Sequence, residues 1–328
     1  MNLTGWIPSR FLWRATGPRV QWTLLGQQRL LDPFYEQALQ RQMAHPFHHL
    51  FRRETSIEEM VDWVSSNPPL EPKGLIFHMS RCGSTLIAQM LAACERNVVA
   101  SEPAPLDGVL RAHFRIRDLA TDVQVRWLRA MVGALSQQRA GGEQAFYLKL
   151  DCWHVHQIDL IRLAFPNAPL IFVYRNPIEV MVSHARMPAA WTIPGLLHPL
   201  VLQLQPEDWD PTKVDAYCAK ALASICKGGH HAAQRYGGLL VNYSELPQAM
   251  YGRVFDHFRL PGEDIPAMQA KAQRNAKSPH MSFTSDAESK RSEATERLRQ
   301  VVAQYLLPVY DQLEETRRTQ LQATTALS

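Results

Sequence analysis

The segment Ser80-Arg81-Cys82-Gly83-Ser84-Thr85 has the residue types of a loop that binds an anion. It follows the apolar run Leu75–Met79 and precedes a segment with helical periodicity. A loop in this place can direct its backbone amides and the helix N-terminus at a phosphate group. The loop lacks the first glycine and the lysine of the GxxxxGK[ST] pattern. ATP or GTP hydrolysis is therefore a poor fit, which leaves a different phosphate ligand or a turn without a ligand.

Charged residues stand at the carboxyl ends of four of the apolar runs that we expect to be strands. They are Arg81, Glu102, Lys149 and Arg175. Ligands of open parallel sheets bind outside the carboxyl ends of the strands. Three cations and one carboxylate at that edge predict a site for a polyanion beside an acid or base.

The elements that must position these residues alternate between short apolar runs and longer helical stretches. The runs are Leu75–Met79, Asn97–Ala100, Phe146–Leu150, Leu170–Tyr174 and Leu239–Tyr243. Buried parallel strands have this continuous apolar character, and helical connections join them. The pattern predicts an α/β fold, a doubly wound parallel sheet of about five strands with helices on both faces.

Residues 1–70 predict a helical or irregular extension that precedes an α/β domain over residues 71–328. Two helices are expected in the extension, over Pro33–Met43 and Ser56–Ser65. The second begins with a capping box, in which Ser56 and Glu59 satisfy free backbone amides. The Pro-rich segment 67–74 is interpreted as the linker to the main domain.

Two segments of the main domain depart from the alternation of strands and helices. The insert 188–211 is too long for an ordinary connection and is interpreted as a lid or an acceptor-binding loop. Its apolar residues Trp191, Ile193, Leu196 and Leu197 favour an acceptor with an apolar portion. A C-terminal helix is expected from about residue 286, where Ser285 and Glu288 form another capping box.

Composition excludes several classes of protein. The formal net charge of +4 on 328 residues suits a small anionic ligand and argues against a nucleic-acid partner. The five cysteines lack the paired spacing of a zinc site, so reduced thiols are expected. We see neither an export signal nor an apolar run long enough to span a membrane, and therefore expect a cytoplasmic protein.

Three motifs in order resemble those of sulfotransferases that use 3′-phosphoadenosine 5′-phosphosulfate (PAPS). SRCGSTL is similar to their 5′-phosphosulfate loop, P-[KR]-S-G-T-T. YRNPIEVMVSH resembles their 3′-phosphate motif, R-[DN]-P with a serine eight residues after the arginine. VNYSELP resembles the Y-E-D-L segment that follows the last strand. The resemblance is dense over residues 74–186 and partial over residues 237–260.

The resemblance implies a P-loop-like sulfotransferase fold, PAPS as the sulfuryl donor and no metal. Arg81 would stabilise charge on the leaving phosphate, and Lys149 would contact the sulfuryl group. Arg175 and Ser183 match the 3′-phosphate ligands, while Tyr243 is a candidate for stacking on adenine or for packing alone. The full set of implied donor contacts is Ser80, Arg81, Cys82, Gly83, Ser84, Thr85, Arg175, Ser183 and Tyr243. The late Arg-Lys-Gly motif is missing, and Lys277 with Ser278 or Lys290 with Arg291 are its candidate substitutes.

Two carboxylates are candidates for the catalytic base. Glu102 matches the glutamate of the tyrosylprotein branch of the family, and Pro103 keeps it out of a helix. Asp151 is the alternative, because it stands where other members carry the histidine of a Lys-x-His motif, and its other interpretation is a helix N-cap. We favour Glu102. For His78, His113 and His154 a structural role is the favoured interpretation.

The function predicted from these features is sulfuryl transfer from PAPS to a hydroxyl or amine of a small-molecule, glycan or lipid acceptor. A P-loop nucleotide kinase is one alternative, although it would carry the missing lysine. A catalytically silent domain that binds a nucleotide is the other. The joint presence of Arg81, Glu102, Lys149 and Arg175 argues against a silent domain.

Overall fold

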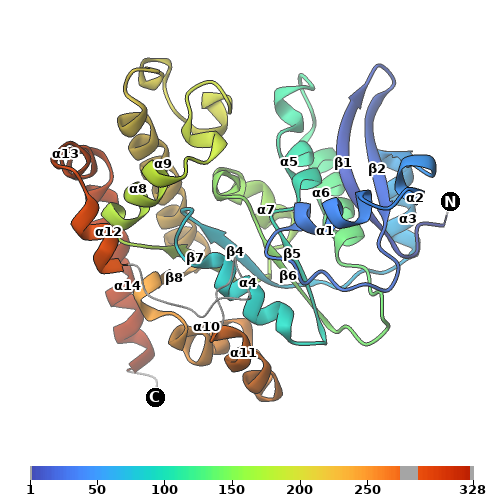
Figure 1. Cartoon of the computed structure of the whole chain (residues 1–328). Helices are drawn as coiled ribbons and strands as arrows, with labels where there is room; N and C mark the ends of the chain where they lie inside the picture. The colour runs from blue at the N-terminus through green and yellow to red at the C-terminus, as the bar shows by residue number, and fades with distance from the viewer. Residues whose placement is uncertain (1, 274–286, 326–328) are drawn as a thin grey trace.

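A five-stranded parallel sheet forms the centre of the protein (Figure 1). The computed structural model describes residues 2–273 and 287–325. The strand order is β5-β6-β4-β7-β8, and every neighbouring pair is parallel. The strands are β4 (Pro72–His78), β5 (Asn97–Ser101), β6 (Ala145–Lys149), β7 (Leu170–Tyr174) and β8 (Leu239–Asn242). The predicted α/β class and all five predicted strands are confirmed, with bounds shifted by at most a few residues.

Helices cover both faces of this sheet. The connection from β4 to β5 runs along the sheet in the direction opposite to the three later connections. Because such crossovers are right-handed, α4 (Ser84–Ala93) packs on one face. The helices α6 (Thr121–Leu135), α7 (Ile158–Ala164) and α9 (Val214–Tyr236) pack on the other face. A β-carbon on Gly229 of α9 would lie 2.5 Å from the Phe172 ring of β7, so glycine lets this helix approach closely.

The first 66 residues form a second, smaller sheet with three helices, at the right of Figure 1. The strands are β1 (Trp6–Arg14), β2 (Gly17–Leu24) and β3 (Arg53–Ser56), antiparallel in the order β1-β2-β3. The helices are α1 (Tyr35–Met43), α2 (Phe47–Leu50) and α3 (Ile57–Ser66). We call residues 2–66 the N-terminal unit. The predicted capping box is confirmed: the Glu59 amide donates to Ser56 Oγ at 3.1 Å and the Ser56 amide donates to Glu59 Oε2 at 2.6 Å.

The prediction of a helical or irregular extension missed this sheet. An irregularity in the pairing between Pro8 and Arg10 changes which face of β1 the later residues occupy, so the sequence lacks the unbroken alternation that marks a half-buried strand. The third strand comes from about thirty residues later in the chain, and Trp22 Nε1 of β2 donates to Thr55 Oγ1 of β3 at 3.0 Å. Pairing between such distant segments is not visible as a local pattern.

The remaining elements surround the sheet. The insert 188–211 contains three short 3₁₀ helices, η3 (Ala190–Thr192), η4 (Pro199–Leu202) and η5 (Pro206–Asp208). Others are α5 (Ala104–Leu110), η1 (Ala112–Phe114), η2 (Cys152–Gln157), α8 (Pro177–Arg186), η6 (Tyr243–Glu245), η7 (Gln248–Tyr251), α10 (Arg253–Phe258), η8 (Gly262–Asp264) and α11 (Ile265–Ala272). The C-terminal part has three helices where one was expected: α12 (Ala287–Glu293), α13 (Glu296–Tyr305) and α14 (Leu307–Thr325). Thr295 caps α13 and Pro308 lies in the first turn of α14, which explains the breaks. Ser285 of the second predicted capping box lies outside the described residues.

Candidate active site

The predicted donor loop, residues 80–85, has an unusual backbone between β4 and α4. Ser80 and Arg81 have φ angles of 76° and 52°, and Gly83 has a φ of 86°. Consecutive residues in such conformations point their amides into a shared concavity that binds anions, and strain of this kind at non-glycine residues is typical of functional sites. A β-carbon on Gly83 would lie 2.7 Å from the ring of Tyr243. Glycine is therefore required at this position by both its conformation and its neighbour.

A hydrogen-bonded chain connects this loop to the favoured base. The amide of Ser80 donates to Nδ1 of His78 at 3.0 Å, and Nε2 of His78 lies 3.1 Å from Oε1 of Glu102. Because Nδ1 accepts, a neutral ring carries its proton on Nε2 and donates it to the carboxylate. Lys149 Nζ donates to the same oxygen of Glu102. Among the described residues, no hydrogen bond reaches Oε2 of Glu102.

The charges in this cluster favour an ionised Glu102 and a neutral His78. Burial raises the pKa of the Glu102 carboxyl, but the charge on Lys149 and the contact with His78 together lower it by more than burial raises it. This pKa is therefore below its usual value. Burial and the same lysine lower the pKa of His78. Lys149 is fully buried, whereas 23% of the Glu102 side chain is exposed. Glu102 also has a φ of 54°, and its amide donates to the Lys149 carbonyl at 2.7 Å.

The structural role that the sequence favoured for His78 is thus only part of its role, because its ring joins the loop to the Glu102 carboxylate. Its position at the last residue of β4, two before the loop, was the available signal. His113 lies apart from this chain: its Nδ1 is 3.4 Å from Gln124 Nε2.

Asp151 lies near this cluster at the start of η2. Its amide donates to His154 Nδ1 at 3.2 Å, and His154 Nε2 lies 3.1 Å from Asp107 Oδ1. Burial raises the pKa of Asp151 to about 7, with His154 opposing the rise and the charge of Glu102 adding to it. The carboxyl therefore exchanges a proton near neutral pH, unlike Glu102. Asp151 also occupies the N-cap position of η2, which was the other interpretation of this residue from the sequence.

Arg175 is held by a buried ion pair. Its Nε donates to Glu179 Oε2 at 2.6 Å, and the two side chains are 5% and 2% exposed. Its guanidinium carbon lies 3.9 Å from the centre of the Tyr243 ring. The other oxygen of Glu179 accepts from Arg291 Nε of α12 at 2.7 Å. Of the candidate substitutes for the late basic motif, Arg291 is thus brought to Arg175, whereas Lys277 and Ser278 lie outside the described residues.

The other residues that were predicted to contact PAPS lie in different surroundings. Arg81 Nη2 donates to the carbonyl of Met187, at the end of α8, at 2.7 Å. The thiol of Cys82 is buried and donates to the Val173 carbonyl at 3.1 Å, which leaves its backbone for a ligand. Ser84 and Thr85 are buried in the first turn of α4. Ser183 lies on α8, one turn after Glu179.

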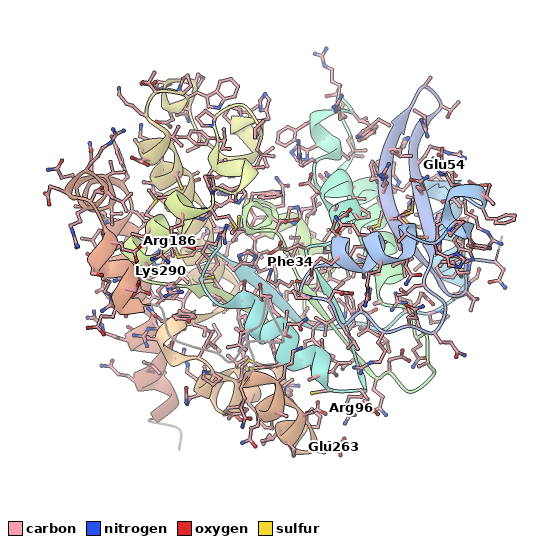
Figure 2. All side chains as sticks on the ribbon, viewed as in Figure 1. Phe34, Glu54, Arg96, Arg186, Glu263 and Lys290 are labelled. Carbon is pink, nitrogen blue, oxygen red and sulfur yellow. The ribbon has the colours of Figure 1, made fainter. Side chains whose placement is uncertain are left out.

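Figure 2 shows Arg186 of α8 beside Lys290 of α12. Arg186 also forms an ion pair with Glu293 of α12. These contacts place α12 along α8, the helix that carries Glu179 and Ser183.

No helix in the described part of the chain is long and apolar enough to cross a membrane. Within residues 2–273 and 287–325, no group of three or more His, Cys, Asp or Glu side chains is arranged to hold a metal ion.

Solved structures with a similar arrangement are bacterial sulfotransferases of low sequence identity. Sulfotransferase STF9 from Mycobacterium avium is 16% identical with a TM-score of 0.45, over 76% of this chain and 80% of that chain. The sulfotransferase domain from the curacin biosynthetic pathway is 16% identical with a TM-score of 0.43, over 77% and 98%. The sulfotransferase domain from the Synechococcus PCC 7002 olefin synthase is 17% identical with a TM-score of 0.45, over 75% and 94%.

No curated protein matches the chain. The comparison with models of protein families does give a match. Residues 75–264, which include the donor loop, Glu102, Lys149, Asp151, Arg175 and Tyr243, match the model of a family described as "Sulfotransferase family". Because this match covers more than half of the sequence, the chain belongs to the sulfotransferase family of enzymes.

Proposed function

We propose that this protein transfers a sulfuryl group from PAPS to a hydroxyl group, or an amine, of a small-molecule acceptor. The observation that carries the proposal is the chain of contacts from Ser80 through His78 to Glu102 and Lys149 at the carboxyl edge of the sheet. This chain joins an anion-binding backbone, a buried cation and an ionised carboxylate. Sulfuryl transfer requires these three groups, because positioning, charge stabilisation and one proton transfer account for its catalysis.

The loop and Arg175 would bind opposite ends of the donor. The amides from Arg81 to Thr85 and the N-terminus of α4 suit the 5′-phosphosulfate. Arg175, with Ser183 one helical turn beyond Glu179, suits the 3′-phosphate. Glu179 and Arg291 would fix the guanidinium of Arg175 before the donor arrives, which reduces the entropy cost of binding.

The proposed reaction is an in-line displacement. The acceptor oxygen forms a bond to sulfur, the bond from sulfur to the 5′-phosphate oxygen breaks, and the acceptor proton moves to Glu102. Oε2 is the suitable acceptor of this proton, since Oε1 already accepts hydrogen bonds from His78 and Lys149. Lys149 would turn from Glu102 to the sulfuryl oxygens. Its departure would raise the pKa of Glu102 and so make it a better base.

The donor can be tested by binding alone. We expect adenosine 3′,5′-bisphosphate to raise the melting temperature by about 4 °C when its concentration is one hundred times its Kd. EDTA should leave that shift unchanged, because the donor needs no metal. Differential scanning fluorimetry with ATP and magnesium as the comparison measures both. Stabilisation by ATP with magnesium, and none by the bisphosphate, would identify a nucleotide kinase instead.

His78 can be tested with two variants that each keep one of its hydrogen bonds. His78→Asn keeps an acceptor for the Ser80 amide but loses the donor to Glu102. His78→Gln keeps that donor but loses the acceptor. If the imidazole positions Glu102, His78→Asn should lower turnover about tenfold or more, the worth of one hydrogen bond to a charged group, and His78→Gln much less.

The readouts for these variants are the release of adenosine 3′,5′-bisphosphate from PAPS and the donor Kd from calorimetry. Nitrogen-15 NMR of the labelled wild-type imidazole should show the neutral tautomer protonated on Nε2. Equal losses in both variants, together with equal falls in melting temperature, would mean that His78 only maintains packing.

A further inference from the structure

The N-terminal unit lies outside the family match, yet several contacts fix it to the catalytic domain. Arg29 Nη2 donates to the carbonyls of Ala92 and Cys94, at the end of α4, at 2.8 and 2.6 Å. Gln89 of α4 donates from Nε2 to the Leu31 carbonyl at 3.2 Å. Because α4 is the helix that follows the donor loop, these bonds position segment 29–34 relative to the active site.

The next residues of this segment reach the catalytic lysine. Nζ of Lys149 lies 5.3 Å from the centre of the Phe34 ring, within the range of a cation–π contact. Figure 2 shows Phe34 at the side of the N-terminal unit that is nearer the main sheet. The N-terminal unit therefore contributes a side chain to the surroundings of the Lys149 and Glu102 pair.

A cavity of about 330 Å³ lies between the β1–β2 hairpin, α1 and the start of α5. Aromatic and apolar side chains line part of it, including Phe11, Trp22, Leu39 and Met43. Its volume is at the lower end of the range for sites that bind small molecules. The cavity thus suits a compact ligand with a flat apolar body.

Two chain positions connect this cavity with the catalytic groups. Ala104 lines the cavity and follows Glu102 by two residues, and Glu36 lines it and follows Phe34 by two residues. Two residues span at most about 7 Å of chain. One wall of the cavity therefore begins close to the favoured base, and another begins close to the ring that covers Lys149.

The charge of the cavity indicates what its ligand carries. Arg10 and Arg52 both line it, and neither guanidinium group forms a hydrogen bond or an ion pair with any residue that the structure describes. Glu36 contributes one opposing carboxylate. Two guanidinium groups against one carboxylate favour a ligand with a carboxylate, sulfate or phosphate substituent.

We propose that the N-terminal unit builds the acceptor site, and that the acceptor is a small hydroxyl compound with a flat apolar body and an anionic substituent. This inference rests on the proposed sulfuryl transfer. Phe34 and the cavity walls hold the body, Arg10 and Arg52 hold the anionic group, and the hydroxyl faces Glu102. The hydroxyl gives its proton to Glu102 and its oxygen bonds to sulfur, as the donor releases adenosine 3′,5′-bisphosphate.

A matched set of probes tests this acceptor class with the full chain. The anionic probes are 4-hydroxybenzoate and the longer 3-(4-hydroxyphenyl)propionate, their neutral matches are the corresponding amides, and hexan-1-ol is the aliphatic comparison. Release of adenosine 3′,5′-bisphosphate above the rate in water alone gives kcat/KM for each. We expect at least one carboxylate to exceed its amide about tenfold, because a charge-assisted contact is lost in the amide.

Variants then assign the preference to the cavity. Arg10→Gln and Arg52→Gln should each reduce the preference for carboxylate over amide, because each lowers kcat/KM for the carboxylate more than for the amide. Phe34→Leu should raise KM for the ring compounds more than for hexan-1-ol. Arg14→Gln is the matched control: Arg14 is a cation on the same strand that pairs with Glu54 and lies outside the cavity lining. It should leave the preference unchanged.

Two further results have separate meanings. If PAPS binds and reacts slowly with water, but the preference is absent or survives both arginine variants, the acceptor site lies elsewhere and this inference is overturned. If PAPS neither binds nor reacts, the proposed function is wrong, and the inference falls with it.

Discussion

Replacing Glu102 by Gln is expected to lower turnover by about 10²–10⁴ with little change in donor affinity, the usual cost of removing a general base. The variant keeps the size of the side chain but cannot accept the acceptor proton. The proton would otherwise go to Oε2, to which no described residue donates a hydrogen bond. Turnover is measured as release of adenosine 3′,5′-bisphosphate from PAPS, and affinity by calorimetry with the bisphosphate.

Asp151→Asn is the comparison for that experiment. Its carboxyl has a pKa raised to about 7 by burial, so it is half ionised at neutral pH and mostly protonated below. If Asp151 were the base, activity would fall as the pH drops through about 7, and Asp151→Asn would remove most turnover. We expect a much smaller loss in Asp151→Asn than in Glu102→Gln. The reverse ranking would assign the base to Asp151.

Arg175→Ala is expected to weaken both the fold and the donor complex. It leaves Glu179 buried without its closest cation, a change that costs about 3 kcal/mol at the lower end of the range for broken buried pairs. The lower end applies because Arg291 still contacts Glu179. The melting temperature should fall by about 4 °C. Affinity for adenosine 3′,5′-bisphosphate should fall by about 1.5–3 kcal/mol, the worth of a charge-assisted hydrogen bond.

A second substitution separates these two effects. In the Arg175→Ala, Glu179→Gln double variant, no uncompensated carboxylate remains, so the melting temperature should recover in part. Donor affinity should stay low, because the phosphate contact is still missing. Recovery of affinity together with stability would mean that Arg175 supports the fold alone. The 3′-phosphate contact would then belong to another residue, such as Arg291.

The main sheet was predictable because its strands are buried on both faces. Burial on both faces requires a continuous apolar run, which the sequence shows directly. The carboxyl ends of parallel strands lie along the same edge of a sheet. The residues at those ends therefore gather at that edge whatever the order of the strands. For that reason Arg81, Glu102, Lys149 and Arg175 could be placed at one edge, although the strand order β5-β6-β4-β7-β8 was unknown.

The contacts inside the site were decided only by the tertiary structure. Glu102 and Lys149 are 47 residues apart, and Glu179 and Arg291 are 112 apart. No local periodicity relates such residues, because their pairing depends on strand order and on helix packing. The same holds for the ring of Phe34 over Lys149 and for the small sheet that carries the cavity. The sequence by itself determined which chemical groups stand at the strand ends, since strand burial is a local property. Folding decided which of them share a proton or a charge, since hydrogen bonds and ion pairs act only between atoms that the whole chain brings within a few ångströms.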